Sequence, residues 1–180
     1  IDTVVPTTTI TGVEYDNANK QIVLAGTNFD TIAAAGADVK SFVDLTKLQW
    51  DLDGDATDPG ITFAAADIAS AIVTSGTVLT ITLTDAAAAA MEATAGFAED
   101  GLGDTNTADN LDVAAGFAVD AAGNVATTDA AANLNPSYSD ATRPTVTSFS
   151  STTADGAFTE NDTINITATM SETVLGGSSI

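Results

Sequence analysis

Carboxylates are the side chains in this sequence that could do chemistry, because its 180 residues include 25 Asp and Glu against 4 Lys and Arg. The sequence contains neither His nor Cys. A Ser/His/Asp or Cys/His nucleophile system, the usual Cys/His zinc site and a disulfide framework are therefore excluded. The formal net charge of −21 also disfavours nucleic acid, since phosphates would be repelled. This charge favours cations as partners.

The densest group of carboxylates lies in residues 51–58, where aspartates first occupy alternate positions. The spacing is similar to the opening of an EF-hand loop, and calcium prefers oxygen ligands of this kind. The segment departs from that motif, because Gly54 stands at the fourth position and Thr62 takes the place of the Glu at the twelfth. A polar hairpin turn after Trp50 is the alternative. The predicted calcium ligands are Asp51, Asp53, Asp55 and Asp58.

A further acidic stretch, residues 99–110, is rich in Gly, Asp and Asn and lacks apolar periodicity. This composition predicts a long exposed loop. Its carboxylates are another candidate for cation binding, with solvated disorder as the preferred interpretation; they are Glu99, Asp100, Asp104 and Asp109.

The excess of acid has a second explanation, which is adaptation to high salt. Screening by salt would remove the self-repulsion that the net charge imposes. Stability that rises with monovalent salt, without specificity for calcium, would favour this explanation over calcium binding.

An enzyme that used paired carboxylates, as in glycoside hydrolysis, would place one of them in an apolar setting and offer a surface to the substrate. The sequence shows no such setting and no aromatic cluster that could bind a sugar. Trp50 is isolated, and Tyr15 and Tyr138 lie far apart along the chain. We therefore expect no enzyme, and we expect Trp50 to lie in the core.

Strands are the main elements that the sequence predicts. Residues 21–29, 45–52 and 77–84 alternate between apolar and polar side chains, and in the last segment Leu79, Ile81 and Leu83 face one way. The alanine-rich run 86–95 predicts one short helix, which Thr84 and Asp85 would cap. Residues 64–73 fit a helix or a strand, residues 117–126 predict a hairpin, and residues 127–137 show no clear element. No stretch approaches the roughly 20 apolar residues of a membrane span, so we expect no membrane insertion.

Two segments of the chain share one layout. Residues 2–10 and 140–148 each contain an Asp, three further residues, Pro-Thr and then Thr at alternate positions. The shift is 138 residues, from Pro6 to Pro144. Because Pro fits the start of a strand, the repeated element predicts the linker and first strand of successive modules, with a chance match as the alternative. After the second linker we expect strands at 145–150 and 163–169.

Several short motifs resemble bacterial Ig-like repeats. Residues 119–125 (Val-Asp-Ala-Ala-Gly-Asn-Val) are similar to the Val-x-Asp-x-Ala-Gly-Asn hairpin of that family, and residues 153–167 are similar to its opening strands. Residues 24–29 (Leu-Ala-Gly-Thr-Asn-Phe) and 44–48 (Asp-Leu-Thr-Lys-Leu) resemble a longer Ig-like repeat of giant bacterial surface proteins.

The resemblance implies an all-β chain with one complete Ig-like β-sandwich module at residues 4–140, a short inserted helix, and the start of a second module at 141–180. It also implies an extracellular or cell-surface protein with a structural or adhesive role, such as a stalk, adhesin, S-layer component or filament. A carbohydrate- or receptor-binding module of an adhesin is the alternative function. The partners would be tandem modules or other copies of the same protein.

The junction between modules is a second candidate calcium site, because the loops of a sandwich cluster at its ends. A shared cation there would stiffen a string of modules, whereas turns of this composition are also favourable without metal. The predicted ligands are Asp120, Asp140, Glu160 and Asp162. A second module that ended at residue 180 would leave unpaired strand edges, which strand donation between subunits or a longer chain could complete.

Overall fold

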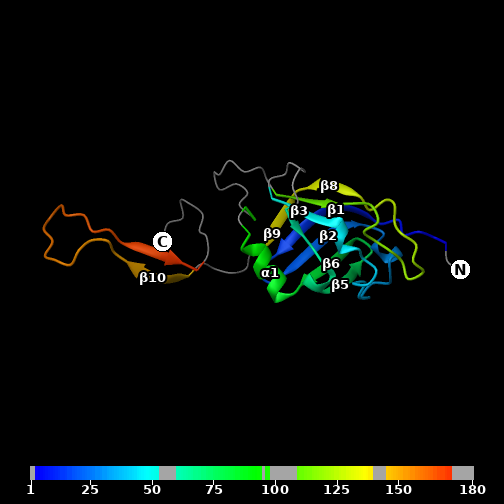
Figure 1. Cartoon of the computed structure of the whole chain (residues 1–180), viewed down its shortest axis with the longest axis horizontal. Coiled ribbons are helices and arrows are strands. Elements are labelled where there is room, and N and C mark those ends of the chain that lie inside the picture. The colour runs from blue at the N-terminus through cyan, green and yellow to red at the C-terminus, as the bar shows by residue number, and fades with distance from the viewer. Residues whose placement is uncertain (1–2, 53–59, 95, 98–108, 140–144, 172–180) are drawn as a thin grey trace. The chain divides into compact units, whose positions relative to one another are not determined.

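A computed structural model of the chain describes residues 3–52, 60–94, 96–97, 109–139 and 145–171. Residue contacts divide the chain into two compact units, Ile1–Ala141 and Thr142–Ile180. The described residues are mostly β, with three sheets and one α-helix (Figure 1).

The larger sheet of the first unit has five strands in the order β5-β6-β2-β1-β9. Strand β1 pairs with β2 in antiparallel fashion and with β9 in parallel fashion. The strands are β1 (Thr9–Asp16), β2 (Gln21–Thr27), β5 (Ile68–Ser75), β6 (Val78–Leu83) and β9 (Pro136–Ser139).

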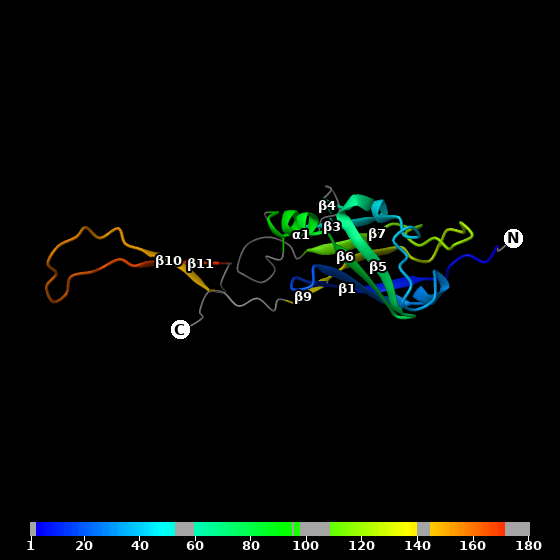
Figure 2. The same ribbon diagram turned by 90° about the horizontal axis from the view of Figure 1, so that it is seen from below.

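The second sheet of this unit has four strands in the order β4-β3-β7-β8. Figure 2 shows β3 and β7 in one layer and β1 and β9 in the other. Both layers contribute fully buried side chains to one core, among them Ile22 and Leu24 from the first sheet and Trp50 and Leu111 from the second. This arrangement is consistent with the predicted all-β sandwich. The strands are β3 (Leu48–Asp51), β4 (Ile61–Thr62), β7 (Asn110–Val113) and β8 (Ala131–Leu134).

Strand β6 follows its alternating sequence closely. Leu79, Ile81 and Leu83 are buried, while Thr80 and Thr82 are partly exposed on the other face. Because successive side chains of a strand point to opposite faces, one half of this pattern fills the core and the other half meets water. The prediction for residues 77–84 is therefore confirmed.

Helix α1 (Asp85–Glu92) forms where the alanine-rich run predicts it. The Thr84 hydroxyl accepts the N–H of Ala87 at 3.3 Å and caps the helix, as expected. Ala88 and Met91 are its buried residues, and Glu92 accepts the hydroxyl of Tyr15 at 2.6 Å, so both packing and a hydrogen bond attach the helix to the sandwich.

The structure resolves the ambiguous segment 64–73 into a 3-10 turn, Ala65–Asp67, followed by strand β5. Residues 127–137, for which the sequence predicts no clear element, contain β8 and the start of β9. Strand β9 begins at Pro136 and forms an edge of its sheet, where a missing N–H is tolerated. Two more 3-10 turns are present, Phe29–Thr31 and Leu45–Lys47.

The second unit contains a two-stranded antiparallel sheet of β10 (Val146–Ser150) and β11 (Thr167–Met170). Strand β10 is predicted nearly to its bounds, whereas β11 begins four residues later than the predicted 163. Every residue of β10 is exposed, in contrast to β1 and β2 of the first unit.

Candidate cation sites

Asp51 and Asn110 face each other where β3 ends and β7 begins. They are directly opposite in the antiparallel ladder, so their side chains project from the same face of the sheet. Neighbouring Trp50 and Leu111 point into the core from the other face. Asp51 is only 1% exposed and Asn110 only 8%. Of the four ligands predicted in the first acidic segment, Asp51 is described; Asp53, Asp55 and Asp58 lie outside the described residues.

The side-chain oxygen of Asn110 is buried, and no residue in the described part of the chain donates a hydrogen bond to it. Such an oxygen loses its bonds to water on folding and gains nothing in return, which makes it uncommon in folded proteins. Sequence reasoning did not single out Asn110, because its position opposite Asp51 depends on the pairing of β3 with β7.

Asp109 is fully buried beside the aromatic core, although the sequence places it in a solvated loop. Its Oδ2 accepts the indole N–H of Trp50 at 2.9 Å and the hydroxyl of Tyr138 at 2.7 Å. The prediction of solvated disorder is therefore wrong for this residue. Glu99, Asp100 and Asp104 of the same stretch lie outside the described residues.

The aromatic residues that lie far apart in sequence come together in the fold, so Trp50 is not isolated. Trp50 lies 6.2 Å from Tyr15 and from Tyr138, and 5.6 Å from Phe97, between ring centroids. Trp50 and Tyr15 are buried, however, so these rings form core rather than a surface for a sugar. Burial and a 2.6 Å hydrogen bond to Glu92 raise the pKa of the Tyr15 hydroxyl above its ordinary value.

Asp120 closes the turn of the 117–126 segment. Its carboxylate accepts the backbone N–H groups of Ala122 at 2.9 Å and Asn124 at 2.8 Å, and the side-chain amide of Asn124 at 2.8 Å. The Asn124 side-chain bond is the main cause that lowers the pKa of Asp120 below its usual value. These donors explain the Asp in the turn without a metal ion.

Asp120 also lies at the N-terminal end of the first unit, because Asn124 donates to the Val4 carbonyl at 3.3 Å. Ser139, which precedes Asp140, pairs with Asp16 at the other end of β1. Eight residues of strand separate these ends by roughly 23 Å. The structure thus does not bring Asp120 near the last described residue before Asp140, and Asp140 itself lies outside the described residues.

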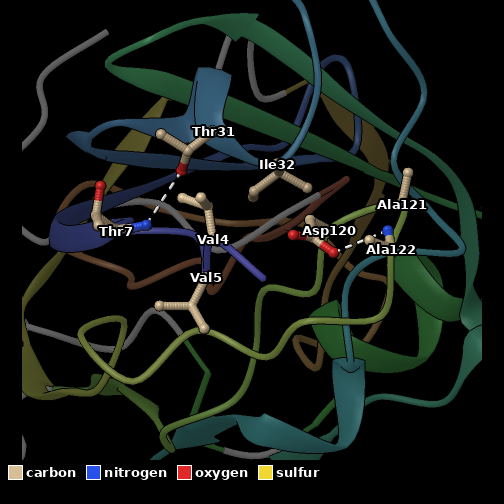
Figure 3. A pocket seen from close by; sticks show the side chains of 8 residues that line it. All are labelled: Val4, Val5, Thr7, Thr31, Ile32, Asp120, Ala121 and Ala122. Carbon is tan, nitrogen blue, oxygen red and sulfur yellow. Dashed lines mark hydrogen bonds between the residues drawn. The ribbon is translucent and has the colours of Figure 1, made fainter. Parts of the chain in front are cut away.

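A pocket of about 590 Å³ opens beside this turn (Figure 3). Val4, Val5 and Ile32 give it an apolar lining, and Asp120 supplies its carboxylate. No aromatic ring lines it, and the Asp120 carboxylate is occupied by the turn. The pocket therefore offers no stacking surface for a carbohydrate.

Glu160 and Asp162, the predicted ligands of the second unit, are both exposed. Asp162 Oδ2 accepts the backbone N–H of Thr159 at 2.5 Å and its hydroxyl at 3.1 Å. This is a local turn. Glu160 and Asp162 are near each other because they are two residues apart in the sequence.

Asp129 is a buried carboxylate that sequence reasoning missed. It accepts the backbone N–H groups of Gly116 at 3.0 Å and Ala118 at 2.7 Å. It is 0% exposed and fixes the segment between β7 and the turn at Asp120. No local signal distinguishes it, because its donors lie more than ten residues earlier in a segment of irregular structure.

Among the described residues, no three carboxylates lie close enough together to hold a metal ion by themselves. No helix in the described ranges is long and apolar enough to cross a membrane. Comparison of the chain with protein-family models, curated proteins and solved structures found no match.

Proposed function

We propose that the chain is a structural repeat of an extracellular bacterial surface protein or filament, in which successive Ig-like β-sandwiches set distance. The extracellular location and the Ig-like family rest on the sequence resemblance. The tandem arrangement has support of a different kind, which comes from the way β10 and β11 repeat β1 and β2.

The two strand pairs share one register, including a bulge. In β1, Ile10 pairs with Gly26, the ladder skips a residue, and Val13 pairs with Leu24. In β10, Val146 pairs with Met170, the ladder skips a residue, and Phe149 pairs with Ala168. Each first strand therefore has an apolar residue, a skipped Thr, a small residue (Gly12 or Ser148) and a second apolar residue. The shift is 136 residues (146 minus 10), close to the 138 of the Pro-Thr motifs.

Burial differs sharply between equivalent positions. Ile10 and Val13 are 5% and 6% exposed, whereas Val146 and Phe149 are 46% and 71% exposed. Ile166, which directly precedes β11, is 69% exposed. In the first unit the face with Ile10 and Val13 is covered by the β3–β7 sheet, and β6 and β9 pair with the outer edges of β2 and β1.

Among the described residues, no further strand pairs with the outer edges of β10 and β11, and an exposed apolar sheet face with unpaired edges is a liability in a protein of any function. Because its register repeats that of β1–β2, the cover that fits it is a second sheet of the kind formed by β3 and β7. We therefore expect strands from a module of the same type to cover this face of the second unit. These strands come either from a longer chain or from another copy by strand donation.

The experiment is to isolate the protein from its natural source and to measure its mass twice. Intact mass under denaturing conditions gives the chain, and light scattering under native conditions gives the assembly. A chain far heavier than 18.0 kDa supports tandem modules, and an 18.0 kDa chain in a large assembly supports strand donation. An 18.0 kDa monomer in both measurements would overturn the proposal.

A further inference from the structure

We propose that Asp51 and Asn110 hold a divalent cation, of which Ca²⁺ fits best, at the end of the β3–β7 pair. This inference goes beyond the role as a spacer and does not depend on it, because both ligands belong to the first unit.

Asp51 and Asn110 are paired across the antiparallel β3–β7 ladder. Directly opposite residues of an antiparallel pair have Cβ atoms about 4.5–5.5 Å apart on one face of the sheet. Asp51 and Asn110 are such a pair. A cation between their side chains could therefore contact a carboxylate oxygen and an amide oxygen together, with no change of the backbone.

A second observation concerns the side-chain oxygen of Asn110. It is buried, the described residues supply no hydrogen-bond donor to it, and Asn110 is only 8% exposed. A cation is the ligand that would satisfy an acceptor of this kind, and it would also favour the buried charge of Asp51.

The neighbouring carboxylates show why this pair differs. Asp112, two residues along β7 on the same face, accepts the backbone N–H of Asn133 at 2.7 Å. Asp129 is fully buried and accepts two backbone N–H groups, those of Gly116 and Ala118. Asp112 and Asp129 are therefore explained by hydrogen bonds within the protein, whereas the oxygen of Asn110 has no donor among the described residues.

The donor set selects the class of cation. Asp and Asn oxygens suit hard cations, and the sequence has no His or Cys that would favour zinc or copper. Calcium takes six to eight oxygens and tolerates an irregular shell that includes water. Magnesium demands a near-ideal octahedron and releases its waters reluctantly, so the burial of both side chains favours calcium, whose shell is more flexible.

The sole tryptophan gives a direct readout of this position. Trp50 precedes Asp51, so Tb³⁺ bound in place of Ca²⁺ would lie close enough to accept energy from the indole. We expect Tb³⁺ emission on indole-selective excitation of the 180-residue chain, and its loss when Ca²⁺ is added in competition. We also expect a higher melting temperature in Ca²⁺ than in chelator at constant ionic strength, because only the folded state has the site.

The test variant is Asn110→Leu, which keeps the shape of the side chain and removes its oxygen. Its melting temperature in chelator should equal or exceed that of the wild type, while the calcium-dependent rise and the Tb³⁺ emission disappear. Asp112→Asn is the matched control on the same face and should keep both calcium responses. A wild type without a calcium response, an equal rise in Na⁺ at matched ionic strength, or an Asn110→Leu variant that retains the response would overturn the proposal.

These outcomes are separate from those of the mass measurements. The spacer role can fail while the cation response persists, and the cation response can fail in a protein that proves to be a long chain of modules.

Discussion

The hydroxyl of Tyr138 donates a 2.7 Å hydrogen bond to Oδ2 of Asp109, a carboxylate with no exposed surface. Tyr138 belongs to β9 in the five-stranded sheet, and Asp109 directly precedes β7 in the four-stranded sheet. The bond therefore joins the two layers of the sandwich. The same oxygen accepts the indole N–H of Trp50, which fixes the orientation of the largest side chain in the core.

Removal of this acceptor should destabilise the first unit more than removal of one donor. We expect Asp109→Ala to lower the free energy of unfolding by about 3 kcal/mol, because the buried indole N–H of Trp50 and the half-buried hydroxyl of Tyr138 both lose their acceptor. Tyr138→Phe keeps the ring and should cost about 1 kcal/mol. Urea denaturation monitored by Trp50 fluorescence measures both. The exposed Asp155→Ala is the control, and equal stability of all three variants would contradict the arrangement.

The hydrogen bonds that Asp129 accepts should stabilise the backbone at residues 116–118. Asp129→Ala leaves the N–H groups of Gly116 and Ala118 without an acceptor, so we expect a loss of about 2–3 kcal/mol in unfolding free energy. Asp129→Asn keeps one oxygen acceptor and should lose less. The measurement is again chemical denaturation, and an Ala variant as stable as the wild type would show that these hydrogen bonds have no energetic role.

Two glycines of the β1–β2 pair should respond in opposite ways to replacement by Ala. A Cβ on Gly26 would lie 1.9 Å from the Thr9 carbonyl oxygen, so Gly26→Ala must displace the strands and should cost about 3 kcal/mol. A Cβ on Gly12 would lie 3.6 Å from the Ala25 side chain, an ordinary contact. Gly12→Ala should therefore be neutral or stabilise by about 0.5 kcal/mol. Melting temperatures of the two variants test the close approach at Gly26.

The turn at Asp120 predicts a dependence on pH. The hydrogen bond from the Asn124 side chain lowers the pKa of Asp120 in the folded state, so the charged turn stabilises folding above the unfolded pKa of about 3.9. That contribution is lost as the pH falls through the folded pKa. Asn124→Ala should move the pKa of Asp120 upward, towards its ordinary value.

The difference in melting temperature between wild type and Asn124→Ala should consequently be largest near neutral pH and shrink in acid. An NMR titration of the Asp120 carboxyl measures the pKa directly. A difference that stays constant down to acid pH would mean that Asp120 and Asn124 interact without regard to charge.

Elements with a local signal could be predicted from the sequence. The alternation in residues 77–84 predicts β6, and the alanine run with Thr84 before it predicts α1, because burial and capping there depend on residues a few positions apart. Strand β9 could not be predicted in this way. It has few apolar residues and forms through parallel pairing with β1, more than 120 residues earlier.

The candidate cation site shows the same limit. The aspartates of 51–58 are visible in the sequence, but the partner of Asp51 is decided by the β3–β7 ladder, which brings Asn110 opposite it. From the sequence, Asp109 is predicted to be solvated. Its hydrogen-bond donors, Trp50 and Tyr138, lie 59 and 29 residues away, so no local pattern indicates them. Asp109 and Asn110 both belong to the acidic stretch 99–110, whose composition alone predicts an exposed loop.

We propose that β10 and β11 begin a second sandwich, which a module of the same type covers. Amide hydrogen exchange over residues 146–170 is the measurement for this proposal, in the 180-residue chain alone and in the protein isolated from its source. An isolated two-stranded sheet is marginally stable, so exchange should be fast in the chain alone. Protection in the native protein should rise to the level of β1 and β2. Fast exchange in both samples would contradict the proposal.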